Sequence, residues 1–272
     1  MSCSPTVLTP TAVVSRLRAA GCVFAEDEAR LLVEAASGTE ALATMVRQRV
    51  EGLPLEQILG WAEFCGLRIA VAPGVFVPRR RSEFLARQAA DLGRNILDSG
   101  ETGELVVLDL CCGSGALGVV VAAELEQVQL HASDVDPAAV ACARRNVARF
   151  NGTVYEGDLF DPLPRRMRGT VNVLTANVPY VPTGEIALLP PEARDHEPLP
   201  ALNGGADGLD VLRRVAREAP VWLAPGGQLL VETSERQAPV AKRIFTEAGL
   251  LATVARCAEL GSTVIIGSRA TY

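Results

Sequence analysis

From Leu105 onward, short apolar segments alternate with longer segments of helical pattern. The expected strands cover residues 105–110, 128–132, 154–156, 171–176, 228–232, 251–255 and 263–266. The expected helices between them cover residues 116–125, 137–149, 208–219 and 237–248. Such alternation predicts an α/β fold, in which a mostly parallel sheet is covered by helices on both faces. Little chain separates the last two strands, so we expect them to form an antiparallel hairpin.

The first part of the chain is predicted to be mostly helical. Apolar spacing and end signals indicate helices over residues 11–20, 25–37 and 39–50, with Thr39 as an N-cap, and a short helix from Pro54 to near Gly60. A hairpin or an extended arm over residues 64–71 and a long helix over 82–97 follow. We therefore predict a helical domain over residues 1–75, a linker segment with a helix over 76–100, and a sheet domain over 101–272.

Composition and charge exclude several classes of protein. No apolar run approaches the ~20 residues of a membrane span, and the first six residues lack the basic and apolar stretches of a signal peptide. The seven cysteines include no Cys-x-x-Cys pair, so we expect neither a metal site nor a disulfide framework. A net charge of −6 weighs against a broad nucleic-acid-binding surface. These features predict a cytoplasmic protein without direct contact to membrane or nucleic acid.

A loop of small residues follows the first strand of the predicted sheet. This strand ends in Asp109-Leu-Cys-Cys-Gly-Ser-Gly115, where the backbone can approach a ligand and the next helix supplies free N–H groups. The second strand ends at Asp134, whose carboxylate can bind both hydroxyls of a ribose. After the third strand, Asp158 can accept a hydrogen bond from an adenine amine, and Leu159 can cover the ring. These three elements predict a nucleotide-type site.

The loop does not match the dinucleotide fingerprint, because Cys111 and Ala116 stand where that pattern requires glycine. Asp109 before Gly-x-Gly instead resembles the first motif of class I methyltransferases, which implies S-adenosylmethionine as cofactor and a Rossmann-like seven-stranded sheet. We interpret Cys111 and Cys112 as small packing residues, with redox control of one of them as the alternative. The predicted cofactor-binding residues are Asp109, Cys111, Cys112, Gly113, Ser114, Gly115, Asp134, Asp158, Leu159 and Asn177.

The fourth strand ends in Asn177-Val-Pro-Tyr180, which resembles the Asn-Pro-Pro-Tyr motif of methyltransferases that act on planar amine or amide nitrogens. An amide nitrogen is a poor nucleophile because its lone pair is delocalised into the carbonyl group. Two acceptors that hold its N–H bonds, the Asn177 side-chain oxygen and the Val178 carbonyl, can aim the lone pair and oppose the positive charge that forms. Tyr180 can pack on the flat amide, and Pro179 fixes the turn. The predicted catalytic residues are Asn177, Val178, Pro179 and Tyr180.

The whole chain is similar to one family, the HemK-type protein-(glutamine) methyltransferases that modify release factors. The matching segments include Glu56-Gln-Ile-Leu-Gly60, Val77-Pro-Arg79 with Glu83, Glu197-Pro-Leu-Pro-Ala-Leu202 and Gly204-Gly-Ala-Asp-Gly208, besides the motifs above. The resemblance implies a substrate-recognising helical domain before a catalytic domain. It also implies methyl transfer to the glutamine of the Gly-Gly-Gln loop of a release factor, or to another translation protein. The predicted substrate-binding residues are Asn177, Val178, Pro179, Tyr180 and Glu197.

Two departures and two alternatives remain open. Val178 replaces a proline of the family motif, and Cys111 can narrow the cofactor pocket, so their effects on activity are not decided by the sequence. The first alternative is an amine methyltransferase that acts on nucleic acid, since that class shares the Asn177 motif. The second is a regulator that binds the cofactor without catalysis.

Three further segments are interpreted without chemistry of their own. We expect Arg79-Arg-Arg81 to be a solvated helix start rather than a partner contact, and residues 195–197 to be exposed or part of a substrate loop. Residues 181–207 are predicted to form a long loop that acts as a substrate lid.

Overall fold

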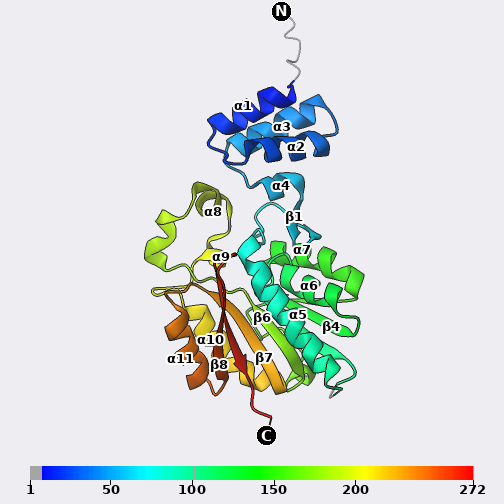
Figure 1. Cartoon of the computed structure of the whole chain (residues 1–272), viewed down its shortest axis with the longest axis vertical. Helices are drawn as coiled ribbons and strands as arrows, with labels where there is room; N and C mark the ends of the chain where they lie inside the picture. Colours follow the sequence, from blue (N-terminus) through cyan, green and yellow to red (C-terminus); the bar gives the residue numbers. More distant parts are fainter. Residues whose placement is uncertain (1–7, 101, 272) are drawn as a thin grey trace, which may run out of the picture.

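The computed structural model describes residues 8–100 and 102–271, and it places a group of helices before an α/β sheet (Figure 1). The start of the chain, on which the signal-peptide prediction rests, lies outside the described residues. The first helices are α1 (Pro10–Ala19), α2 (Ala25–Ala35), α3 (Thr39–Val50) and α4 (Leu55–Leu59). Val13, Leu17, Leu32 and Val46 form part of a separate hydrophobic cluster, so these helices pack mainly on one another.

The end signals of two of these helices differ from the sequence prediction. Thr39 is the first residue of α3 and not its N-cap, because Gly38 takes that position without a side-chain hydrogen bond. Pro54 likewise is the N-cap of α4 and does not lie in its first turn. The helices occur in the predicted order, and they differ from the prediction only in the residues at which they begin and end.

A hairpin and a long helix lead to the sheet. The hairpin consists of β1 (Trp61–Phe64) and β2 (Leu67–Ala70), which pair antiparallel. A 3-10 turn, η1 (Arg80–Ser82), precedes α5 (Glu83–Asp98). The hairpin is hydrogen-bonded to Asn146, a buried residue later in the chain. The Asn146 side chain donates to the Ala70 carbonyl and accepts from the Ala70 N–H, both at 2.9 Å.

The predicted mostly parallel sheet is confirmed. It has seven strands in the order β5-β4-β3-β6-β7-β9-β8, and the final hairpin β8–β9 is antiparallel as expected. The strands are β3 (Leu105–Leu110), β4 (Val128–Asp134), β5 (Thr153–Glu156), β6 (Val171–Ala176), β7 (Leu223–Thr233), β8 (Leu251–Cys257) and β9 (Ser262–Ser268). The main helices are α6 (Ala116–Glu124), α7 (Pro137–Val147), α10 (Asp210–Trp222) and α11 (Ala238–Glu247).

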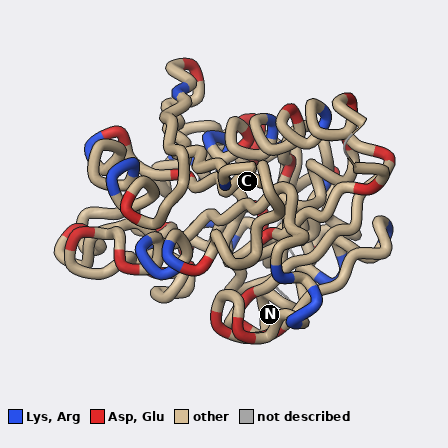
Figure 2. Tube along the Cα trace, turned by 90° about the horizontal axis from the view of Figure 1, so that it is seen from below, with Lys and Arg blue, Asp and Glu red and all other residues tan. Residues whose placement is uncertain are grey.

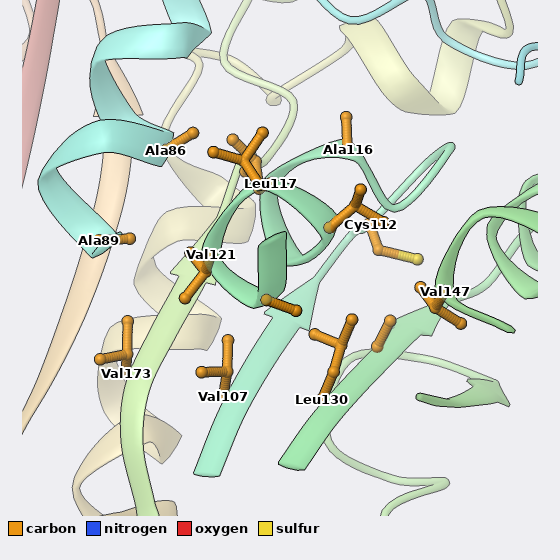
Figure 3. Packing of buried hydrophobic residues seen from close by; sticks show 14 of the residues in the cluster. Ala86, Ala89, Val107, Cys112, Ala116, Leu117, Val121, Leu130, Val147 and Val173 are labelled. Atoms are coloured by element: carbon orange, nitrogen blue, oxygen red, sulfur yellow. The ribbon is translucent and has the colours of Figure 1, made fainter. Parts of the chain in front are cut away.

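Alternate residues of each central strand face opposite helix layers, as the period of a strand requires. Val107 and Val173 pack with residues of α5, α6 and α7, including Leu117 and Val121 (Figure 3). The residues next to them on the same strands, Leu108 and Leu174 among them, pack with α10 and α11. Both faces of the central strands are therefore covered by helices.

The segment between β6 and α10 is not the irregular loop that the sequence predicted. It contains three short helical pieces, η4 (Thr183–Leu188), α8 (Pro191–His196) and α9 (Leu199–Leu202). The prolines that suggested a loop stand before or at the first turn of these pieces, where a missing N–H group is tolerated. In the described part of the chain, no helix is long and apolar enough to cross a membrane.

Candidate active site

A cavity of about 520 Å³ lies at the carboxyl ends of the central strands, where open α/β sheets bind their ligands. Most residues that the sequence singled out line this cavity: Cys111, Cys112, Gly113, Ser114, Asp134, Asp158, Leu159, Asn177, Val178, Pro179 and Tyr180. Three predicted residues do not line it, namely Asp109, Gly115 and Glu197. The cavity thus brings together four chain segments that are far apart in the sequence.

The loop after β3 folds sharply over the strand end. Cys111, Gly113 and Gly115 adopt left-handed backbone angles, with φ of 51°, 55° and 78°. A side chain at Gly113 would meet no atom within 4 Å, which leaves room beside the backbone for a ligand. Asp134 holds this loop from the end of β4, since its Oδ2 accepts from the Gly113 N–H at 2.8 Å. The segment fits the amino-acid end of a cofactor such as S-adenosylmethionine.

Asp109 supports the loop from below and does not face the cavity, which corrects its prediction as a residue in direct contact with the cofactor. Its carboxylate is fully buried and accepts from the Gly118 N–H at 3.0 Å and the Thr175 hydroxyl at 3.1 Å. Gly115 is likewise structural, because it forms the N-cap of α6 beside α7. Both residues fix the path of the loop between β3 and α6.

The buried carboxyl of Asp109 gives a testable dependence of stability on pH. Burial raises the pKa of the Asp109 carboxyl from 3.8 to about 7. The two hydrogen bonds act in the opposite direction and lower this pKa, but burial has the larger effect. Between these values the folded chain keeps a proton that the unfolded chain releases, so the free energy of unfolding falls as pH rises, by at most about 1.4 kcal/mol per pH unit. We expect this contribution to be absent in Asp109→Asn. Urea unfolding of both proteins measures it, and a difference between them that stays constant from pH 4 to 8 would contradict the assignment.

Asp158 and Leu159, which the sequence predicts to contact adenine, both line the cavity. Leu159 is a buried residue with a left-handed φ of 48°, and the Ser133 hydroxyl donates to its carbonyl at 3.0 Å. Backbone strain of this kind is often found at ligand-binding sites. Asp158 forms an ion pair of 2.6 Å with Arg214 of α10, a cavity residue that the sequence did not indicate.

Cys111 and Cys112 pack as small residues, in agreement with the preferred interpretation. Burial raises the pKa of both thiols well above the ordinary value. A thiol with a raised pKa is a poor nucleophile because little thiolate forms. This environment therefore weighs against redox control through either cysteine.

The side chain of Asn177 uses its nitrogen for a hydrogen bond within the protein and leaves its oxygen free for a ligand. Its Nδ2 donates to the hydroxyl of Ser82 at 3.4 Å, and Ser82 is a buried residue of η1. Within the described ranges, neither Asn177 Oδ1 nor the Val178 carbonyl oxygen accepts a hydrogen bond. Two free acceptors on consecutive residues of the cavity wall match the demand of a substrate that offers two N–H bonds.

Tyr180 is fixed by two residues that sequence reasoning missed. Its hydroxyl donates to Oε1 of Glu232 at 3.1 Å, and the Arg81 guanidinium lies 5.4 Å from the centre of its ring. Arg81 also pairs with Glu232, with its Nε 3.0 Å from the same Oε1. Burial raises the pKa of the Tyr180 hydroxyl, with the Glu232 charge as a second cause, so this hydroxyl stays protonated. Tyr180 is therefore a rigid wall of the cavity.

The segment after the Asn177 motif is held by a buried glutamine. Gln237 Nε2 donates to the carbonyls of Tyr180 and Asp207, at 3.0 and 2.9 Å. Gly204 and Gly208 allow the two chain segments to approach, because a side chain at Gly208 would stand 2.3 Å from the Tyr180 carbonyl oxygen. Only the spacing of glycines could have signalled this contact in the sequence.

The basic segment before α5 is exposed at Arg80 and Arg81, as predicted for a helix start, but Arg79 and Arg81 also form ion pairs that the sequence did not indicate. Arg79 forms a 2.6 Å ion pair with Glu197, whose side chain is fully buried and also accepts from the Val77 N–H at 3.3 Å. With Arg81 on Glu232, two of the three arginines hold buried glutamates. Glu197 is therefore neither exposed nor a lining residue, and it anchors the segment before α9. Among the described residues, no group of three His, Cys, Asp or Glu could hold a metal ion.

Comparison with known proteins agrees with this geometry. Residues 68–187 match the family described as "Methyltransferase small domain". The chain is 37% identical over 207 residues to the release factor glutamine methyltransferase of Geobacter sulfurreducens, covering 75% of this chain and 69% of that protein. It is 33% identical over 264 residues to the protein of the same name in Deinococcus radiodurans, covering 90% and 91%.

One relative carries a different name. The chain is 36% identical over 204 residues to the 4-amino-L-phenylalanine/4-methylamino-L-phenylalanine methyltransferase of Streptomyces pristinaespiralis, covering 75% of this chain and 69% of that protein. Among solved structures, a methyltransferase from Pyrococcus furiosus superposes with a TM-score of 0.53 at 19% identity, covering 76% of this chain and 90% of that one. That similarity concerns the fold alone, which is the class I methyltransferase fold.

Proposed function

The chain belongs to the HemK family of release factor glutamine methyltransferases, and we propose that it methylates the side-chain amide nitrogen of a glutamine in a protein. As a member of this family it is an S-adenosylmethionine-dependent methyltransferase. The proposed substrate is the Gly-Gly-Gln loop of a peptide-chain release factor. Because release factors act in translation, the proposed location of the enzyme is the cytoplasm. The helices before residue 75 are the proposed region that recognises the release factor.

The observation that carries this proposal is the pair of free acceptors on Asn177 and Val178. A primary amide offers two N–H bonds in one plane, and two acceptors can hold both while the nitrogen lone pair points away from that plane. Tyr180, fixed by Glu232 and Arg81, provides a flat surface for the amide. Methyl transfer would break the sulfur–methyl bond as the nitrogen–methyl bond forms, and the two oxygens would stabilise the positive charge that grows on the nitrogen. The nitrogen would then release one of its two N–H protons to solvent, which leaves the N-methyl amide and S-adenosylhomocysteine.

S-adenosylmethionine supplies an electrophilic methyl group when it is bound. We assign its amino-acid end to the loop of residues 111–114, its ribose to Asp134, and its adenine to Asp158 and Leu159, since all of them line one cavity. The Val178 side chain is buried, and only its backbone carbonyl takes part in this scheme, so the departure from proline leaves the acceptor in place.

Removal of the Asp134 carboxylate should weaken cofactor binding. This carboxylate accepts from two loop N–H groups, of Gly113 and Asp136, and it would accept from the ribose hydroxyls as well. Hydrogen bonds to a charged acceptor contribute about 1.5–3 kcal/mol, so Asp134→Ala should raise the Kd for S-adenosylmethionine about 10- to 100-fold. Titration calorimetry measures this, with the exposed Glu156→Ala at the end of β5 as control. Equal affinities of both variants would remove Asp134 from the site.

A second candidate function rests on the relative from Streptomyces pristinaespiralis, whose name gives an aromatic amine as substrate. An aromatic amine also offers two N–H bonds to Asn177 and Val178. The nucleic-acid alternative has less support, because the chain carries a net charge of −6 and its basic and acidic residues are interspersed (Figure 2). The non-catalytic alternative has none in the geometry, since both acceptors are free.

The proposal is tested by offering three substrates to the purified enzyme with S-adenosylmethionine. They are a release factor, 4-amino-L-phenylalanine and total RNA. We expect one methyl group on the glutamine of the Gly-Gly-Gln tryptic peptide and none on the other two. Transfer to the amino acid instead would favour the small-molecule function, and transfer to RNA with a steep salt dependence would favour the nucleic-acid function.

A further inference from the structure

A buried carboxylate stands directly beside Asn177 in the cavity wall. β6 and β7 are parallel neighbours, with Ala176 paired to Val231 at their carboxyl ends. The next residues along the two strands are Asn177 and Glu232, so their positions are adjacent across the sheet edge. Both residues line the cavity, and Glu232 is only 2% exposed. The proposed mechanism uses Glu232 only to hold Tyr180.

The two oxygens of this carboxylate have unequal surroundings. Oε1 accepts from the Tyr180 hydroxyl at 3.1 Å and from Arg81 Nε at 3.0 Å. Oε2 is buried and has no hydrogen-bond partner in the described part of the chain. A buried carboxylate oxygen without a donor is unfavourable, because it has lost water and gained nothing in return. Because Glu232 lines the cavity, a substrate that displaces the atoms now covering Oε2 would donate a hydrogen bond to this oxygen.

We propose that Glu232 is a substrate-binding residue whose Oε2 accepts a hydrogen bond from an N–H group that flanks the amide to be methylated. The inference rests on the proposed function for the identity of that amide. The donor is either a backbone N–H of a peptide or the α-ammonium group of a free amino acid, since both carry hydrogen on nitrogen close to the side chain. A substrate that presents a carbonyl or carboxylate at this place is rejected, because it would meet a buried negative charge.

The test removes the donor from the substrate and leaves the protein intact. Calorimetry compares a blocked peptide that contains Gly-Gly-Gln with two analogues, methylated on the backbone nitrogen of glutamine or of the following residue. The enzyme is saturated with S-adenosylhomocysteine, so that binding is read without turnover. We expect one analogue to bind at least about tenfold more weakly, as for the loss of a hydrogen bond to a charged acceptor. A second titration compares free glutamine with its desamino analogue, which lacks the α-ammonium group. If affinity differs only between these two compounds, the donor is the α-ammonium group of a free amino acid.

The variant Glu232→Gln should bind the parent peptide and the weaker analogue with equal affinity. Glu197→Gln is the matched control, since it changes another buried glutamate that pairs with an arginine of the same segment but lies outside the cavity lining. This control should keep the preference. If the wild-type enzyme shows no preference in any pair, Glu232 only holds Tyr180 and Arg81, and the inference is wrong. If the preference is present but no release factor is methylated, the proposed function fails and this inference stands.

Discussion

Asn177→Ala should lower kcat for methyl transfer by about 10²- to 10³-fold, as expected when one aligned acceptor is removed from a transition state. Its Nδ2 is engaged by Ser82, so Oδ1 is left for the substrate amide. Alanine removes that oxygen and leaves the Val178 carbonyl as the one remaining acceptor of the pair. The cofactor contacts assigned to the loop after β3 do not involve this oxygen, so the affinity for S-adenosylmethionine should change far less than kcat.

Single-turnover kinetics with a release factor measure this effect, and calorimetry measures cofactor affinity in parallel. Asn95→Ala is a matched control, because it makes the same chemical change on an exposed position of α5. It should leave both quantities unchanged. A variant at Asn177 that transfers methyl groups at the wild-type rate, with normal cofactor binding, would show that the amide is held by other groups.

Gly208→Ala should lose most of the activity and part of the stability. Gly208 has a φ of +78°, and an added Cβ would stand 2.3 Å from the Tyr180 carbonyl oxygen and 2.4 Å from Gln237 Nε2. The left-handed angle costs an alanine roughly 1–2 kcal/mol, and overpacking costs about 1–3 kcal/mol more. The atoms that must move belong to the motif that holds the substrate, where a shift of about 1 Å can reduce the rate about 100-fold.

The comparison for this prediction is Gly184→Ala in the same connection between β6 and α10. A side chain at Gly184 would meet nothing within 4 Å, and its φ is not left-handed. Thermal unfolding and kcat/KM should therefore be close to wild type at Gly184 and strongly reduced at Gly208. Similar behaviour of the two variants would mean that the glycine run does not position Tyr180.

The local parts of the site could be predicted from the sequence because each is a strand end followed by a recognisable loop. Asp134 and Asn177 follow apolar strands, and parallel strands bring their carboxyl ends to one edge. The alternation of apolar segments likewise predicted the sheet and its final hairpin.

The supporting contacts could not be predicted, because their partners are distant in the sequence. Arg79 and Glu197 are separated by 118 positions, and Arg81 and Glu232 by 151. The sequence predicts a substrate contact or exposure for Glu197 and a solvated helix start for the arginines, and nothing local to these residues indicates the ion pairs that they form. The motif of Asp109 before the glycines predicts a cofactor contact for Asp109, but the side chains of a strand alternate between its two faces and this one is buried.

We propose that this chain methylates a glutamine side chain of a release factor in the cell. Peptide mass spectrometry of release factors from cells with the gene, without it, and with the Asn177→Ala form tests the claim directly. We expect the Gly-Gly-Gln peptide to carry one methyl group on glutamine only in cells that hold the intact gene. An unchanged methyl group on that glutamine in all three kinds of cell, or its absence from all three, would contradict the proposed function.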